Sequence, residues 1–182
     1  RGEILHGSMD KIAERLKVLV RVADAKEKLN HMRLGCFGTP GGLIASDADP
    51  DVLRVSSGME LIVYELEELV EEYQKGGYPE NQYTEELKKK NYDPQEIEKA
   101  LNVYGALKRL IEKHDLHAVS VKCFDLLELI HTTGCLALAI LNAEGIPAAC
   151  EGDQKSLVSM AIMKVLTGKS GFMANPSCMD PD

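Results

Sequence analysis

The most constraining feature of this 182-residue sequence is the alternation of short apolar runs with segments of helical periodicity. The runs are continuously apolar, as in strands buried on both faces, rather than alternating between apolar and polar residues. They are Met32–Gly38, Leu61–Tyr64, His117–Phe124, Ile146–Cys150 and Gly171–Asn175. Strands separated by helices pair in parallel, and right-handed crossovers then place helices on both faces. The sequence therefore predicts an α/β fold, a doubly wound (Rossmann-like) parallel sheet of about five strands.

The segments between these runs carry helix signals. Met9–Leu29 has an apolar period of 3.6 residues and Ser8 as its N-cap, and Asp93 followed by Pro94 begins a second long helix that runs to about His114. Further helices are predicted after Tyr64 to about Gly76–Gly77, briefly within 78–92, at Thr133–Asn142 and at Lys155–Leu166. Residues 39–50 are rich in turn residues.

Composition and charge narrow the class of protein. The chain is 45% hydrophobic, which suits one globular domain of this length, and its net charge is −8. Residues 60–98 hold 12 acidic and 4 basic residues, a pattern typical of solvated helix faces. We expect no nucleic-acid partner, because no basic patch is interleaved with aromatic residues. We expect no membrane partner, because the longest clear apolar run is only Cys135–Leu141. We expect no signal peptide, because charged residues interrupt the first thirty positions throughout.

The five cysteines, at positions 36, 123, 135, 150 and 178, are widely spaced and include no C-x-x-C pair. This spacing argues against a structural zinc site and a disulfide framework, and it favours a reducing cytoplasm. Cys36, Cys123 and Cys150 lie in apolar runs, where cysteine usually acts as a small hydrophobe. A nucleophilic Cys123 would need a histidine, and His131 is the only one close in sequence.

Functional sites in parallel sheets form beyond the carboxyl ends of the strands. The candidate segments are therefore Gly38–Asp51, Glu65, Phe124–Thr133, Glu151–Gln154 and Asn175–Asp180. The glycine-rich stretch 35–42 favours a turn over phosphate binding, because Phe37 replaces the second glycine of the dinucleotide motif. Gly168-Lys169-Ser170 is not a P-loop, because it precedes a strand instead of following one.

Two stretches at predicted strand ends each allow a functional and a structural interpretation. Lys122 to Asp125 is interpreted equally well as a polar site or as a solvated strand end. Glu151-Gly152-Asp153 is the most informative segment, and two interpretations stay open. The two carboxylates suit a divalent cation with oxygen ligands, but Asp153 also suits the N-cap of the next helix, with Glu151 favoured by the helix dipole.

Several short motifs keep a distinctive order and spacing across Val119–Asp180. They are Lys122-Cys123-Phe124-Asp125, Thr133-Gly134-Cys135-Leu136-Ala137, the run from Leu141 to Asp153, Leu166-Thr167-Gly168 and Phe172-Met173-Ala174-Asn175-Pro176. Together they resemble the middle region of the L-fucose isomerase family and its fucose isomerase-related members.

This resemblance implies a metal-dependent aldose–ketose isomerase that works through an ene-diol. The family typically uses Mn²⁺, held by a Glu, a later Asp and a distant His. Glu151 matches the Glu and is expected to be both metal ligand and catalytic base, whereas the Asp position falls on Asn175. Asn offers a neutral carbonyl oxygen and no carboxylate, so Asn175 would be a modified metal ligand or a sugar partner. The His would lie beyond Asp182.

On the same basis, residues 1–182 are expected to form a single middle domain of a larger cytoplasmic isomerase, cut near the start of its C-terminal domain. The full-length protein is expected to bind a small sugar and to form a homo-oligomer. The isolated chain is expected to be inactive, with no bound Mn²⁺. Two alternatives stay open: a catalytically lapsed sugar-binding or regulatory module, and a domain that mainly builds an oligomer interface.

Overall fold

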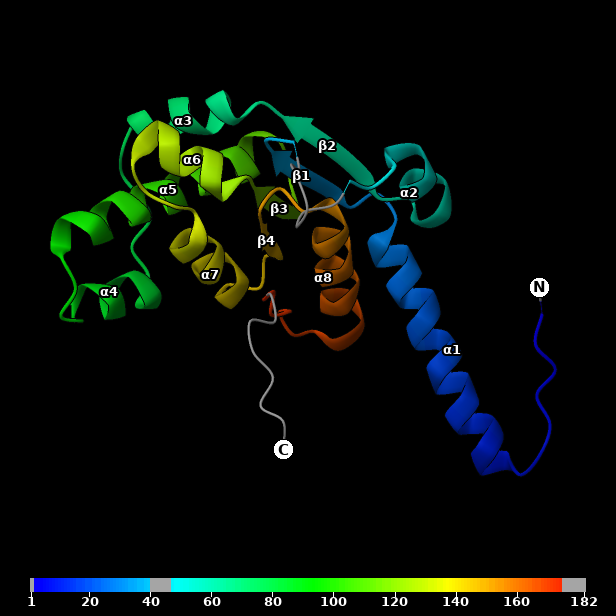
Figure 1. Cartoon of the computed structure of the whole chain (residues 1–182). Helices are drawn as coiled ribbons and strands as arrows, with labels where there is room; N and C mark the ends of the chain where they lie inside the picture. Colours follow the sequence, from blue (N-terminus) through cyan, green and yellow to red (C-terminus); the bar gives the residue numbers. More distant parts are fainter. Residues whose placement is uncertain (1, 40–46, 175–182) are drawn as a thin grey trace, which may run out of the picture.

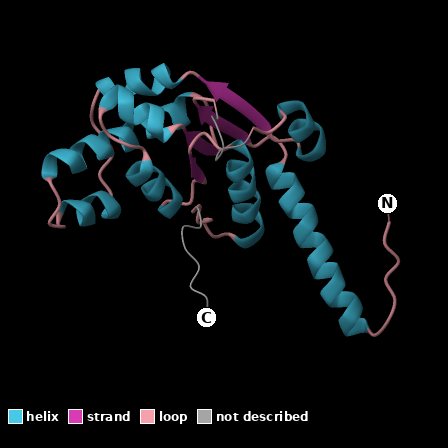
Figure 2. Ribbon diagram, viewed as in Figure 1, coloured by secondary structure: helices cyan, strands magenta, loops and turns pink. Residues whose placement is uncertain are grey.

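The computed structural model describes residues 2–39 and 47–174, and these form helices on both sides of one small sheet (Figures 1 and 2). The elements are α1 (Met9–Leu29), β1 (Arg33–Phe37), α2 (Pro50–Ser57), β2 (Glu60–Tyr64), α3 (Leu66–Gln74), α4 (Gln82–Lys88), α5 (Pro94–Lys113), β3 (Ala118–Val121), α6 (Cys123–Ile130), α7 (Cys135–Ala143), β4 (Ala148–Cys150) and α8 (Gln154–Thr167). The predicted α/β fold is confirmed.

The sheet is parallel throughout, in the order β2-β1-β3-β4. Cys36 of β1 lies opposite Val63 of β2 and Ser120 of β3, and Val121 of β3 lies opposite Cys150 of β4. Since β2 follows β1 on one side and β3 and β4 follow on the other, the sheet is doubly wound, with a topological switch point between β1 and β3.

Each face of the sheet has its own apolar core. Helices α3, α5, α6 and α7 cover one face around Phe37, Val119 and Val121, whereas α2 and α8 cover the other around Leu34 and Ala149. Burial on both faces explains why the strands are continuously apolar. The longest core helix, α5, begins as predicted, with Asp93 as N-cap and Pro94 in the first turn.

The structure differs from the sequence prediction at three elements. Within the described part of the chain there are four strands, because residues 171–174 form no strand. Strand β3 ends at Val121, and Lys122 to Asp125 begin α6 instead of closing the strand. Helix α2 was not predicted; Asp49 caps it by accepting hydrogen bonds from the backbone N–H groups of Asp51 and Val52. Residues 40–46 of the predicted turn region lie outside the described residues.

Helix α1 has the predicted bounds and the predicted N-cap, Ser8, but not the expected burial. Ala25 is its one buried residue, and Leu16 and Val20 of its apolar stripe are 47% and 58% exposed. In Figure 1 the helix projects from the body of the molecule and reaches it only at its C-terminal end, beside α8. No helix among the described residues is both long and apolar enough to cross a membrane.

Candidate active site at the end of strand β4

The four parallel strands bring four loops to one edge of the sheet. The first residues after β1, β2, β3 and β4 are Gly38, Glu65, Lys122 and Glu151. This is the edge at which sequence reasoning placed the site.

Glu151 has the most constrained backbone of these residues. It adopts a left-handed conformation with φ of 63°, and Gly152 follows with φ of 67°. A non-glycine residue in this region costs about 1–2 kcal/mol. Such strain persists only where the surrounding structure imposes it, and it clusters at functional sites.

Hydrogen bonds fix the residues that follow Glu151. The Gly152 N–H donates to the Val121 carbonyl at 3.0 Å, and the Gly152 carbonyl accepts from the Cys36 thiol at 3.3 Å. The Asp153 N–H donates to the Cys150 carbonyl at 3.1 Å. The turn is therefore held against β1 and β3, whereas the Glu151 side chain is only partly buried.

Asp153 and Gln154 are buried parts of this support. The Asp153 carboxylate accepts a hydrogen bond of 2.8 Å from the Ser156 N–H and is the N-cap of α8. The Gln154 side-chain oxygen accepts one of 2.8 Å from the Ala48 N–H, which ties the loop before α2 to the start of α8. The N-cap interpretation of Asp153 is thus confirmed, and Glu151, the other acidic residue of this turn, lines a pocket.

The pocket beside Glu151 has a volume of about 460 Å³ and mostly apolar walls. It lies between α7, β4 and residues 171–174, and its lining includes Leu138, Cys150 and Phe172. The side chain of Asn142, another lining residue, is engaged: it donates to the Ala148 carbonyl at 2.7 Å and accepts from the Ala148 N–H at 3.1 Å. Small-molecule sites are typically concave, with apolar walls and a few placed polar groups.

A second depression, of about 300 Å³, lies at the switch point of the sheet and has a more polar lining. Glu65 and Glu128 line it, together with Lys122, whose ammonium group pairs with the Asp125 carboxylate at 2.8 Å. Lys122 and Asp125 therefore form an ion pair with each other at the start of α6. The segment is polar, as predicted, but its charges are mutually neutralised.

The oxygen donors around Glu151 bear on the predicted divalent-cation site. A carboxylate oxygen, as in Glu151, is a ligand that Mn²⁺ and Mg²⁺ prefer, so the donor type fits. Within residues 2–39 and 47–174, no group of three or more potential His, Cys, Asp or Glu ligands includes Glu151. The other predicted ligand, Asn175, lies outside the described residues. Further ligands would have to come from beyond the described part of the chain.

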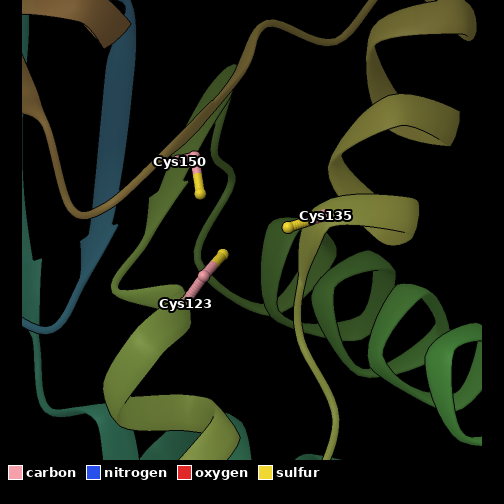
Figure 3. A group of neighbouring side chains, drawn as sticks. All are labelled: Cys123, Cys135 and Cys150. Carbon is pink, nitrogen blue, oxygen red and sulfur yellow. The ribbon is translucent and has the colours of Figure 1, made fainter. Parts of the chain in front are cut away.

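Sequence reasoning missed a cluster of three cysteines next to this pocket. Cys123 begins α6, Cys135 begins α7 and Cys150 ends β4, and their sulfur atoms all lie within 4.8 Å of one another (Figure 3). Cys123 is buried, Cys150 is partly buried and Cys135 is exposed. Separations of 12 and 15 residues give no recognisable motif; only the pairing of β3 with β4 and the packing of α7 on β4 reveal the cluster.

The thiols of the cluster act on one another. Hydrogen bonding with Cys123 and Cys150 lowers the pKa of Cys135, whereas hydrogen bonding with Cys135 and burial raise the pKa of Cys123. The histidine considered for a Cys–His pair, His131, lies at the opposite end of α6, about 12 Å along the helix from Cys123. Sequence proximity therefore does not translate into a catalytic pair.

Comparison with known proteins identifies the family. The family model of the L-arabinose isomerase central domain matches residues 55–169, more than half of the chain. The chain belongs to this family. The matched region runs from within α2 through α8, and it includes Glu151 and the three clustered cysteines.

Two curated relatives are sulfoquinovose isomerases. The one from Alkalicoccus urumqiensis is 24% identical over 183 residues, covering 94% of this chain and 41% of that protein. The one from Clostridium sp. (strain MSTE9) is 25% identical over 179 residues, covering 93% and 40%. The chain thus spans about two fifths of the length of these relatives. The predicted relationship to sugar isomerases is confirmed, while the narrower attribution to L-fucose isomerase stays a prediction.

Proposed function

We propose that this chain is the central domain of a longer aldose–ketose isomerase and that Glu151 is its reacting carboxylate. The observation that carries the proposal is the position of Glu151, at the carboxyl end of β4, on a strained and hydrogen-bonded turn, beside an apolar pocket. The family match supports the reaction class. Coverage of about two fifths of the relatives supports a longer protein with further domains.

In the proposed aldose–ketose isomerisation, a carboxylate moves one proton between adjacent carbons of the sugar. A general base of this kind must be held at a fixed position, because misplacement by about 1 Å costs a large part of the rate. The backbone hydrogen bonds of Gly152 and Asp153 supply that rigidity for Glu151. The apolar walls, including Leu138 and Phe172, limit the water that competes for the carboxylate.

A divalent cation, Mn²⁺ in our proposal, supplies Lewis-acid stabilisation of the ene-diolate when it is bound. Among the described residues, Glu151 would be a ligand to it, and Asn175 is our proposed second ligand. The Asn amide is neutral, so this position would balance less of the cation's charge than a carboxylate would.

The proposed substrate is a small sugar. The pocket volume of about 460 Å³ is within the usual range of roughly 300–1,000 Å³ for small-molecule sites. Sulfoquinovose, L-arabinose and L-fucose are the first candidates, because they come from the two relatives, the matched family and the sequence resemblance respectively. We also propose that the full-length protein is cytoplasmic and homo-oligomeric.

Asn175 favours a second candidate function, a sugar-binding or regulatory module that has lost the chemistry. Turnover assays on the full-length protein, with Mn²⁺ and the three sugars, distinguish the two. Turnover that is lost in Glu151→Gln supports the isomerase. Absence of turnover on every sugar, together with binding of one of them, supports the module.

The isolated 182-residue chain is expected to be inactive and to bind Mn²⁺ weakly or not at all, because its described residues supply one oxygen ligand at the site. Isothermal titration calorimetry with Mn²⁺ measures this directly. Micromolar binding that disappears in Glu151→Ala would show that the chain carries a complete site and would contradict the expectation.

A further inference from the structure

The cysteine cluster has a geometry that sulfur atoms adopt around one ion. Three thiolates bound to a tetrahedral Zn²⁺ at about 2.3 Å have their sulfur atoms about 3.8 Å apart. Cys123, Cys135 and Cys150 have sulfur atoms that all lie within 4.8 Å of one another. Closing the set around an ion therefore takes movements of about 1 Å or less, which side-chain rotation supplies. In Figure 3 the three side chains point toward a common centre from three different elements.

The electrostatics of the fold favour negative charge at this place. Cys123 and Cys135 are the first residues of α6 and α7, and neither helix has a side-chain N-cap hydrogen bond. Each helix N-terminus is equivalent to roughly half a positive charge and stabilises a nearby thiolate. Three thiolates with one divalent cation carry a net charge of −1, which the two helix termini offset.

The backbone also leaves room for the sulfur atoms. A Cβ atom at position 134 would lie 3.1 Å from the Cys123 sulfur, so Gly134 allows the start of α7 to approach it closely. Cys135 and Cys150 line the pocket of about 460 Å³. A water molecule from that pocket can therefore reach an ion held by the three thiolates and complete its coordination.

We propose that Cys123, Cys135 and Cys150 bind one thiophilic divalent cation of the Zn²⁺ class, with solvent as the fourth ligand. On binding, each thiol releases its proton to solvent and its sulfur forms one bond to the ion. The site is distinct from the hard-cation position proposed at Glu151, because thiolate ligands select soft ions and carboxylates select hard ones. It does not depend on isomerase activity and is tested without it.

The test is a Cd²⁺ titration of the reduced 182-residue chain in a Cys178→Ser background, followed by thiolate-to-metal charge-transfer absorption. We expect saturation at one ion per chain, an intensity corresponding to three thiolates, and displacement by Zn²⁺. Cys123→Ser, Cys135→Ser and Cys150→Ser should each weaken binding by at least about tenfold, since loss of supporting second-shell groups alone has that effect.

Cys36→Ser is the matched control. Cys36 is also buried, at the end of β1, but its thiol donates to the Gly38 and Gly152 carbonyls and lies outside the cluster. This variant should bind Cd²⁺ like the parent chain. Absence of charge-transfer absorption, or equal weakening in Cys36→Ser, overturns the proposal.

A measurement without substitutions covers the case in which a buried serine prevents folding. The exposed Cys135 of the parent chain is alkylated with and without Zn²⁺, and mass spectrometry reports its rate of modification. We expect Zn²⁺ to slow that rate at least tenfold. An unchanged rate, or a disulfide among the three cysteines in place of free thiols, contradicts the site.

Discussion

At the scale of single residues, the left-handed conformation of Glu151 has a cost in folding stability that can be measured separately from the chemical role proposed for its side chain. A glycine at this position avoids a backbone cost that any other residue except Asn or Asp bears in full. Glu151, with φ of 63°, bears this cost, and His31, Asp115 and His131 elsewhere in the described chain also have positive φ.

We predict that Glu151→Gly is more stable than Glu151→Ala by about 1 kcal/mol, after the greater freedom of glycine in the unfolded chain is counted. Urea denaturation of both variants measures the difference in free energy of unfolding. Glu65 is the matched control, because its φ of −65° and ψ of 143° lie in the extended region. At position 65 the order should reverse, so that Glu65→Gly is less stable than Glu65→Ala. If Glu151→Gly is no more stable than Glu151→Ala, the backbone at position 151 is not strained.

Residue-level prediction succeeded where the signal was local. The N-caps Ser8 and Asp93 were predicted, and Asp153 was recognised as one of two interpretations, because a cap depends on its own helix. Glu151 was singled out because it follows an apolar strand and matches the Glu of the family that the sequence resembles, and its chemical role stays a prediction. The cysteine cluster was missed, because its three members come together only through strand pairing and helix packing. No spacing rule encodes such a contact.

At the scale of elements, α5 is crossed at Gly105 by the turn that follows α3. A Cβ atom at position 105 would lie 2.0 Å from the carbonyl oxygen of Gly77 and 2.8 Å from the Cα of Tyr78. The helix therefore has a glycine in its buried middle because another backbone segment occupies the space of a side chain.

Gly105→Ala tests this crossing. Helix propensity alone predicts a gain of about 1 kcal/mol, whereas overpacking predicts a loss of about 1–3 kcal/mol. We expect the loss, measured as the free energy of unfolding in urea. A more stable Gly105→Ala variant would show that the turn does not pack on α5 in this way.

Helix α1 should contribute little to the stability of the core. Leu16→Glu is expected to change the free energy of unfolding by less than about 0.5 kcal/mol, because Leu16 is 47% exposed. Leu157→Ala in α8, where the side chain is fully buried, should cost about 2–5 kcal/mol. Thermal and urea unfolding of both variants make the comparison. A similar loss in both would mean that α1 packs more extensively than its exposed face indicates.

Element prediction was accurate for helices with a clear period and cap, such as α1 and α5. It was less accurate where the residues of a segment suited both a strand and another structure. Lys122 to Asp125 reads as a strand end, but the chain turns into α6 directly after β3. Residues 171–174 are apolar enough for a strand, yet they form none. The Cys150 N–H instead donates a hydrogen bond to the Met173 sulfur, with 3.3 Å between nitrogen and sulfur.

At the scale of the whole molecule, the acidic segment 60–98 is not only a solvated surface. Glu72 of α3 is 7% exposed, and its carboxylate accepts hydrogen bonds from Lys75 at 2.5 Å and Arg109 at 3.1 Å. The hydrogen bond from Lys75 lowers the pKa of Glu72, burial opposes that effect, and the bond from Arg109 adds to it. Part of the negative charge thus joins α3 to α5.

This arrangement predicts a specific acid sensitivity. Because the pKa of Glu72 is lower in the folded chain, its stabilisation is fully present above its ordinary value of 4.5 and is lost as pH falls through the lowered value. The Glu72→Gln variant should have a free energy of unfolding about 1 kcal/mol lower than that of the parent chain at neutral pH. On acidification its free energy of unfolding should fall by less than that of the parent chain. Urea denaturation at neutral and acidic pH measures both. Parallel pH profiles for the parent chain and the variant would contradict the prediction.

The fold and the relationship to sugar isomerases were both predictable at this scale, because strand alternation determines a parallel sheet and short motifs keep their order and spacing. The L-arabinose isomerase central-domain match extends the relationship to residue 55, into a half of the chain where the sequence offered only element order. The metal site stays a prediction, since Asn175 lies outside the described residues and no group of three potential ligands among the described residues includes Glu151.

The central claim is that Glu151 is the reacting carboxylate of a sugar isomerase. It is tested most directly by the isomerisation rate of the full-length protein carrying Glu151→Gln, compared with Glu65→Gln, which changes a carboxylate at the same edge of the sheet. We predict that Glu151→Gln lowers the rate by roughly 10²–10⁴-fold and that Glu65→Gln leaves it within about twofold. A Glu151→Gln protein that isomerises its sugar at the parent rate would contradict the account.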